Sequence, residues 1–152
     1  MSIDDEYKLL SRLELFEYLD PVHLKRLIFV SQRYQLQPQE YLFKQGDPMG
    51  NVFGIVAGEF SVLLESANGE MVVAQQGPGD LVGEMAVISG EPRSASIRAN
   101  TVCEVIGFEK DLFIKTVTND PPTALKMMQL LSERLLNQNK QLAKFSNGQF
   151  NV

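Results

Sequence analysis

The chain has 152 residues and a formal net charge of −5, with 44% apolar and 22% charged residues. This composition predicts one globular domain with a hydrophobic core. The negative charge argues against broad nucleic-acid binding, which needs a basic face to displace phosphate counterions. No apolar run is long enough to predict a membrane span, and the acidic start lacks a secretory h-region. The single cysteine, Cys103, fits a reducing compartment, so we expect a cytoplasmic protein with no membrane partner.

Residues 1–30 are predicted to be helical. One apolar stripe recurs there at three-residue steps, formed by Leu10, Leu13, Phe16 and Leu19. Asp20 and Pro21 predict the start of a second helix, because aspartate can cap the free amides and proline suits the first turn.

Residues 33–109 consist of short β-type runs separated by glycine-containing turns. The strongest hairpin signal is Asn68-Gly69, since both residues accept a positive φ. Many short strands with glycine-rich turns predict a sandwich, a roll or a barrel instead of a parallel sheet.

Residues 110–145 are predicted to return to helix, with Asp120 as a cap before Pro121 and Pro122. Apolar positions are dense from Leu125 to Leu136 and sparse afterwards. The first half of this helix is therefore expected to pack firmly and the second half to move most easily. Residues 146–152 are expected to form a flexible tail.

The stretch from Gly83 to Ala95 concentrates the chemistry of the chain. Gly83 permits a positive φ and close approach to a ligand, and residues 84–88 could form one helical turn whose free amides face an anion. Pro92 is expected to start a strand that presents Arg93, whose planar fork suits phosphate. Glu84 would repel a phosphate, so we expect it to accept a hydrogen bond from a sugar hydroxyl. Ser94 adds a hydroxyl beside the arginine.

These residues resemble the cassette of the cyclic nucleotide-binding domain family, which includes catabolite-activator-like proteins and protein kinase A regulatory subunits. The matching segments are Gly83-Glu84-Met85-Ala86-Val87 and Pro92-Arg93-Ser94-Ala95, while Val82 replaces the usual aromatic residue. The resemblance runs from about residue 13 to residue 142. It implies a mainly β (α+β) fold, an antiparallel β-roll of the double-stranded β-helix or jelly-roll type. The expected single domain, 1–145, contains N-terminal helices (1–30), the roll (33–109) with its cassette (83–95), and a C-terminal helical lid (110–145).

The resemblance also implies a role for each site residue. Arg93 would bind the exocyclic oxygens of the cyclic phosphate, and Glu84 with the Gly83 amide would bind the ribose 2′-hydroxyl. The Ala86 amide and Ser94 would complete the phosphate cradle. Apolar contacts to the base are assigned to Met85 and Val73, and lid contacts to Leu135, Gln138 and Leu142. The simpler structural alternative is a surface arginine at position 93 that pairs with Glu91 or Glu84.

The function that follows is a regulatory sensor of cAMP or cGMP, with cAMP the slightly favoured ligand. One histidine, one cysteine and the absence of a P-loop motif predict no enzyme, catalytic residue, metal site or cofactor. The alternatives are a ligand-independent β-roll scaffold, or the sensor part of a longer transcription regulator, channel or kinase subunit. The chain shows no DNA-binding module or basic patch, so we expect no DNA binding. The seven-residue step from Leu135 to Leu142 is compatible with a homodimer, and a protein effector is the other expected partner.

Overall fold

The computed structural model describes residues 2–144, except for the side chains of residue 138 and residues 141–144. Two four-stranded antiparallel sheets form the body, in the orders β1-β8-β3-β6 and β2-β7-β4-β5. The fold is therefore a β-roll with flanking helices, as the resemblance predicted. The strands are β1 (Gln32–Leu36), β2 (Tyr41–Phe43), β3 (Val52–Ala57), β4 (Phe60–Ser66), β5 (Gly69–Gln76), β6 (Leu81–Val82), β7 (Ser96–Ala99) and β8 (Cys103–Phe108).

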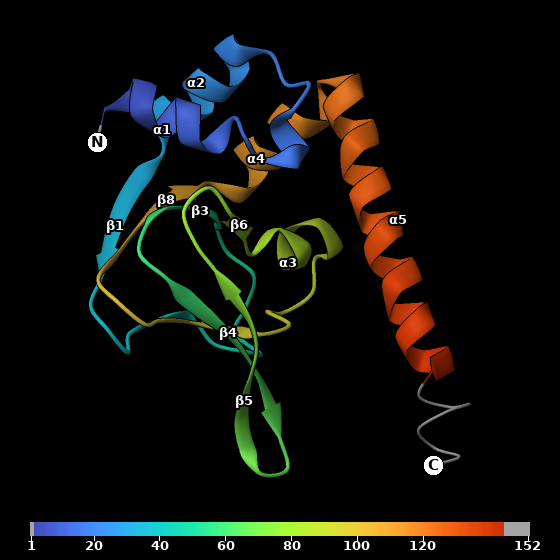
Figure 1. Cartoon of the computed structure of the whole chain (residues 1–152). Helices are drawn as coiled ribbons and strands as arrows, with labels where there is room; N and C mark the ends of the chain where they lie inside the picture. Colours follow the sequence, from blue (N-terminus) through green and yellow to red (C-terminus); the bar gives the residue numbers. More distant parts are fainter. Residues whose placement is uncertain (1, 145–152) are drawn as a thin grey trace.

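The helices occupy one end and one side of the roll (Figure 1). The helices α1 (Ile3–Leu10), α2 (Pro21–Val30) and α4 (Lys110–Thr118) gather at one end, and the short α3 (Glu84–Ser89) lies against the side. The long α5 (Pro121–Lys144) runs past the roll on the side of α3. No helix in the described part of the chain is both long and apolar enough to cross a membrane.

The N-terminal region buries the predicted apolar residues, but it is not one continuous helix before Asp20. Leu10 ends α1, and Phe16 lies in a separate 3-10 turn, η1 (Glu14–Phe16). Both side chains are buried, as is Leu19. The three-residue repeat therefore reflects a chain that folds back over the core through a 3-10 turn, whose own period is three. The second helix begins as predicted, with Asp20 accepting a hydrogen bond from the Val22 amide.

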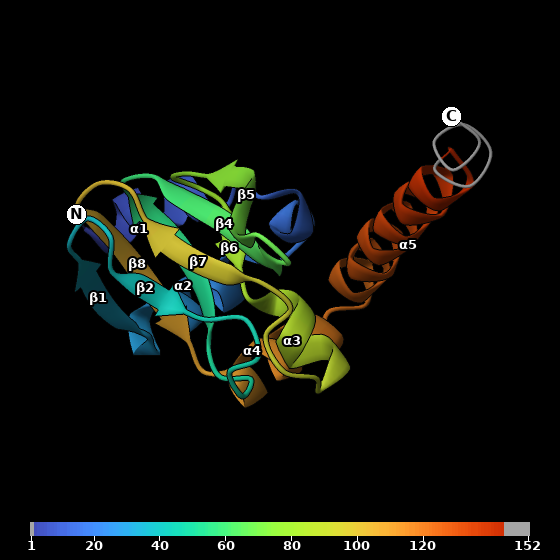
Figure 2. The same cartoon turned by 90° about the horizontal axis from the view of Figure 1, so that it is seen from below.

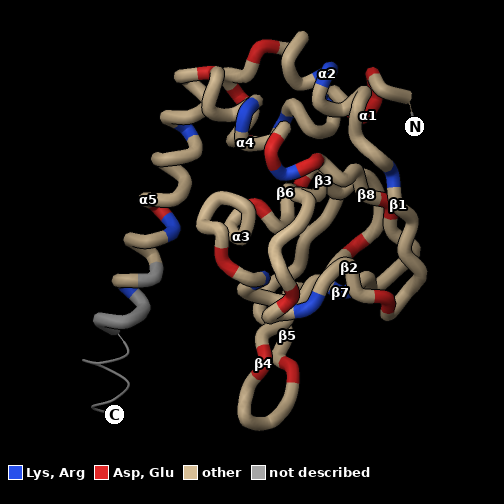
Figure 3. The backbone as a smooth tube through the Cα atoms, turned by 180° about the vertical axis from the view of Figure 1, so that it is seen from behind, with Lys and Arg blue, Asp and Glu red and all other residues tan. Residues whose placement is uncertain are grey.

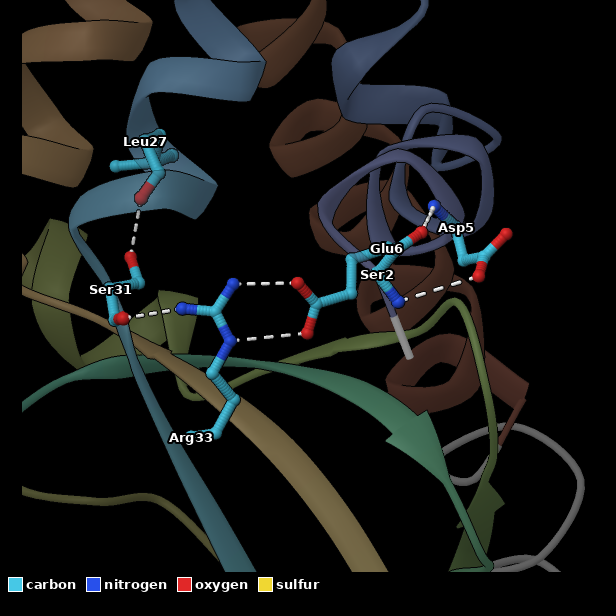
Figure 4. Close-up of polar contacts among 6 residues, drawn as sticks. All are labelled: Ser2, Asp5, Glu6, Leu27, Ser31 and Arg33. Atoms are coloured by element: carbon cyan, nitrogen blue, oxygen red, sulfur yellow. Dashed lines mark hydrogen bonds and ion pairs between the residues drawn. The ribbon is translucent and has the colours of Figure 1, made fainter.

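An ion pair between a buried glutamate and a partly exposed arginine fastens α1 to the roll (Figure 4). Arg33 of β1 donates from Nη2 and Nε to the two carboxylate oxygens of Glu6, at 2.6 and 3.2 Å. Its Nη1 also donates to the Ser31 carbonyl at 2.6 Å, and the Ser31 hydroxyl donates to the Leu27 carbonyl. Because the Glu6 side chain is 5% exposed, the bidentate arginine satisfies a carboxylate that would otherwise be costly to bury.

Two apolar clusters form the core. The first joins the helices to β3 and β8, and includes Leu10, Ile28, Phe108 and Phe113. The second fills the roll and includes Phe60, Ile97 and Val105, together with the buried Cys103. The cassette grows from the second cluster, because Val82 belongs to it and directly precedes Gly83.

The β4–β5 hairpin forms as predicted, although its turn differs. Ser66 pairs with Gly69, so Ala67 and Asn68 occupy the centre of the turn. Gly69 has φ +101, whereas Asn68 is not among the residues with positive φ. The hairpin therefore uses one left-handed glycine at its exit instead of two left-handed central residues.

The helix α5 packs less firmly than its dense apolar sequence predicted. Figures 1 and 2 show that it leaves the helical end and extends away from the strands. Met127 is buried, and Leu130 and Leu131 pack partly against the core. Other apolar side chains of this helix are exposed, namely Leu125 (53%), Met128 (58%), Leu135 (58%) and Leu136 (58%). The expected tail, 146–152, lies outside the described residues.

Candidate functional site

A pocket of about 240 Å³ opens between the roll, α3 and α5. It brings together the end of β6, the first turn of α3 and the segment that leads into β7. Strands β2, β4 and β5 supply its apolar wall, and α5 supplies one arginine. The lining residues are Phe43, Val62, Ala74, Gln76, Leu81, Val82, Gly83, Glu84, Met85, Ala86, Arg93, Ser94, Ala95, Ile97 and Arg134.

Gly83 is required at the start of α3 for two reasons. It is the N-cap residue and has φ +87, a conformation that costs a residue with a side chain about 1–2 kcal/mol. A Cβ atom at this position would also lie 2.6 Å from Nη1 of Arg93 and 3.3 Å from the Asn51 carbonyl oxygen. The glycine therefore turns the chain into the helix and leaves space for the guanidinium.

Arg93 is the central polar group of the pocket and is only 5% exposed. Its Nη1 donates to the Gly83 carbonyl at 3.1 Å, and its Nη2 donates to the Asn51 carbonyl at 2.8 Å. Of the five N–H groups of a guanidinium, these bonds use two, and the buried Nε has no partner among the described residues. The arginine is therefore held in place while some of its donors remain free for an anion.

The surroundings of Arg93 hold a positive charge in a pocket whose lining is partly polar and partly apolar. Its guanidinium carbon lies 4.1 Å from the centre of the Phe43 ring, a cation–π arrangement. Burial lowers the pKa of Arg93, and the negative charge of Asp47 opposes that shift. The group stays protonated because an arginine titrates far above neutral pH. A buried, permanently charged donor that has no carboxylate partner among the described side chains suits an anionic ligand.

The backbone of Arg93 is fixed by the loop between β2 and β3. The Arg93 amide donates to the Asp47 carbonyl and the Gly46 amide donates to the Arg93 carbonyl, both at 2.8 Å. The expectation that Pro92 starts a strand is wrong, because β7 begins at Ser96. The arginine is placed by this two-bond clamp in a loop, and not by the edge of a sheet.

Glu84 connects the pocket to α5. Its carboxylate lies 3.4 Å from Nη2 of Arg134, and the two side chains are 16% and 50% exposed. Figure 3 shows charged residues midway along α5, at about the level of α3. The alternative of a surface Arg93 that pairs with Glu91 or Glu84 is wrong. Arg93 is buried, and Glu84 pairs with Arg134 instead. Glu84 is therefore directed to a cation on α5 and not to Arg93.

Most of the predicted site residues come together in this pocket. Gly83, Glu84, Arg93 and their cassette neighbours Met85, Ala86 and Ser94 all line it. Val73 does not, since it lies on β5 with 47% of its side chain exposed, and the next residue, Ala74, faces the pocket instead. Leu135 is exposed and lies outside the lining. The side chains of Gln138 and Leu142 lie outside the described residues.

Three contributors were missed by sequence reasoning. Phe43 and Asn51 reach Arg93 from other strands and loops, and no local pattern links them to the cassette. Arg134 had a weak signal, because it is a cation next to the proposed lid residue Leu135. Which of two adjacent helical residues faces the pocket depends on how α5 packs, which the sequence alone does not specify.

Comparison with known proteins identifies the family of the chain. The model of the cyclic nucleotide-binding domain matches residues 33–120, more than half of the chain. The chain therefore belongs to the cyclic nucleotide-binding domain family, whose members are regulatory domains.

Individual relatives span several kinds of regulator. The CRP-like protein Clp of Xanthomonas campestris is 29% identical over 135 residues, which cover 84% of this chain and 59% of Clp. The catabolite activator protein of Thermus thermophilus superposes with a TM-score of 0.79 at 26% identity, covering 88% of this chain and 63% of that one. The regulatory domain of Toxoplasma gondii PKA, solved with cAMP, gives 0.72 at 25% identity and covers 75% and 44%. The chain thus spans about three fifths of the length of Clp.

Proposed function

We propose that this protein is a sensor of a cyclic nucleotide, cAMP or cGMP, that binds in the cassette pocket and changes the position of α5. The observation that carries the proposal is the buried Arg93, which is held by two backbone carbonyls and whose Nε has no partner within residues 2–144 as the structure describes them. A cyclic phosphate carries one negative charge and presents two exocyclic oxygens, which match the free donors of this fork.

The other cassette groups supply the remaining contacts. Glu84 accepts a hydrogen bond from the ribose 2′-hydroxyl, while the Ala86 amide and Ser94 complete the phosphate cradle. The base lies against apolar lining, for which Met85 and Val62 are available. Similarity to the Toxoplasma regulatory domain, which was solved with cAMP, favours cAMP over cGMP.

The link from ligand to α5 is the pair between Glu84 and Arg134. A ribose hydroxyl that donates to Glu84 shares this carboxylate with Arg134, so occupancy changes the contact that α5 makes with the cassette. Since the outer part of α5 has few other contacts with the roll, a small change in free energy is enough to shift it.

Isothermal titration of cAMP and cGMP into the wild type and the Arg93→Ala variant tests the proposal. Loss of a buried charge-assisted contact costs about 2–5 kcal/mol, a fall in affinity of roughly thirtyfold or more. Arg98→Ala is the matched control, because Arg98 lies on β7 outside the pocket lining. Wild type that binds neither nucleotide would leave the ligand-independent scaffold as the better account, and undiminished binding by Arg93→Ala would remove the assigned role.

A homodimer through α5 is part of the proposal. Leu125, Met128 and Leu135 are all more than half exposed and follow one another at steps of three and seven residues, so they lie on one side of the helix. A second copy would cover this stripe. Sedimentation velocity should show a wild-type dimer that Met128→Glu converts to a monomer. A wild type that stays monomeric at every concentration contradicts the dimer without touching ligand binding.

A second candidate is the sensor part of a transcription regulator. It is favoured by the similarity to Clp and to the Thermus catabolite activator over more than four fifths of this chain. The mass of the native polypeptide, measured on protein from its source, distinguishes the two cases. A mass well above 17.0 kDa supports the regulator, and a mass equal to it supports a stand-alone sensor.

A further inference from the structure

A second pocket, of about 230 Å³, lies between α2 and α4 and shares no lining residue with the cassette pocket. Both helices belong to the group at the end of the roll (Figure 1). The apolar part of the lining is formed by the buried Leu27 and the half-buried Leu112. The polar residues of the lining are His23, Arg26, Lys115, Thr116 and Asn119.

Helical spacing explains why these side chains converge. His23, Arg26 and Leu27 are three and four residues apart and therefore share one face of α2. On α4, Leu112 and Lys115 are related by the same spacing, and Asn119 is the C-cap residue one turn further along. The two faces meet because α2 packs against α4. The polar groups are thus carried by regular helices and not by mobile loops.

The charge of this pocket is unusual for a chain of net charge −5. Its lining contains two cations and an imidazole but no carboxylate. In the part of the chain that the structure describes, the side chains of His23, Arg26 and Lys115 make no hydrogen bond or ion pair, whereas Arg33 pairs with Glu6 and Lys126 with Glu14. Figure 3 shows basic residues on both α2 and α4. Cations gathered in one pocket repel one another unless an anion binds between them.

We propose that this pocket binds a small organic phosphomonoester. The phosphate lies between Arg26, Lys115 and His23, and the organic group packs on Leu27 and Leu112. A phosphomonoester carries about −1.5 to −2 charges at neutral pH and three acceptor oxygens, which match two permanent cations and an imidazole. A monocarboxylate would leave one cation without compensation. The Asn119 amide is a further available donor at the rim.

The chain offers a direct reporter for this site, because His23 is its only histidine. The two carbon-bound ring protons of His23 can be followed by NMR without ambiguity while phenyl phosphate is added in a phosphate-free buffer. Inorganic phosphate and benzoate are titrated in parallel, so that the phosphate and the apolar group are tested separately. The proposal predicts a saturable shift with phenyl phosphate, and an affinity at least severalfold higher than for either of the other two anions.

Variants decide whether the shift comes from the proposed contacts. Arg26→Gln combined with Lys115→Gln should weaken phenyl phosphate binding about tenfold or more, as expected for losing charge-assisted hydrogen bonds. Both residues are exposed, so folding should be unaffected. Lys25→Gln removes one charge from the same helix outside the lining and should leave the affinity within about twofold.

Three kinds of result would overturn the proposal. The first is an unshifted His23, or perturbations confined to α3 and Arg93, which would place phenyl phosphate in the cassette pocket. The second is equal affinity for inorganic phosphate, or an unchanged affinity in the double variant. The third is a His23 shift that appears with an acidic peptide such as tetraglutamate but not with phenyl phosphate, which would assign the pocket to a protein partner.

Discussion

The cassette and the helix α5 meet at one ion pair but are held in place differently. Arg93 is fixed by two hydrogen bonds to carbonyls, two backbone bonds to the β2–β3 loop and the ring of Phe43. By contrast, α5 is attached mainly near its start, through Met127 and the pairs of Lys126 with Glu14 and Glu17. Arg93 is therefore preorganised. In the proposed function this spares the ligand the entropic cost of ordering the arginine, and the less firmly attached α5 is the part that responds.

The attachment of α5 through Met127 gives the largest expected effect on stability. Met127→Ala should lower the free energy of unfolding by about 2–3 kcal/mol, because it removes buried methylene groups and the thioether from the packed face. Gln129→Ala shortens an exposed neighbour on the same helix and should change stability by less than about 0.5 kcal/mol. Urea denaturation measures both variants. Equal, small effects would mean that even the first half of α5 is not packed on the core.

The rigidity of the cassette is tested by Gly83→Ala. The positive φ and the approach of the new Cβ to Arg93 should cost about 1–3 kcal/mol in stability, and displacement of the guanidinium should weaken nucleotide binding. Gly69→Ala is a matched control, since Gly69 also has a positive φ (+101) but no atom lies within 4 Å of its added Cβ. Thermal denaturation and nucleotide titration should show that both variants lose stability and that only Gly83→Ala loses affinity. Unchanged affinity in Gly83→Ala would contradict a preorganised cassette.

The contact between the two regions should have the smallest effect. Arg134→Gln breaks a half-exposed pair with Glu84 and should change stability by no more than about 1 kcal/mol. Affinity should fall by up to about fivefold, because the uncompensated carboxylate would then face an anionic ligand. Added salt should reduce the difference between wild type and variant, and Glu133→Gln on the same helix serves as the charge control. A loss of affinity as large as that expected for Arg93→Ala would make Arg134 a principal ligand contact. It would contradict the view that only the cassette is preorganised for the ligand.

Contacts within the cassette could be predicted from the sequence, whereas contacts that depend on how distant segments pack could not. Gly83 and Arg93 lie ten positions apart and touch through a short helical turn, so their proximity follows from local chain geometry. The β-roll was also predictable, since short runs and glycine turns specify strands and the cassette identifies the family. Phe43 and Asn51 were not, because they reach the site through sheet pairing and a distant loop. Val73 and Ala74 differ only in which face of β5 they occupy, and Leu135 and Arg134 differ only in helical phase.

In the proposed function, a cyclic nucleotide binds at the cassette and α5 responds. Amide hydrogen exchange, measured with and without saturating cAMP, tests both parts in one experiment. With cAMP bound, we expect slower exchange in α3 and around Arg93 and a changed exchange rate in the part of α5 beyond Met127. Exchange in α2 should be unaffected and serves as an internal reference. Unchanged exchange in α3 would contradict binding at this site, and protection of α3 with no change in α5 would contradict the proposed output.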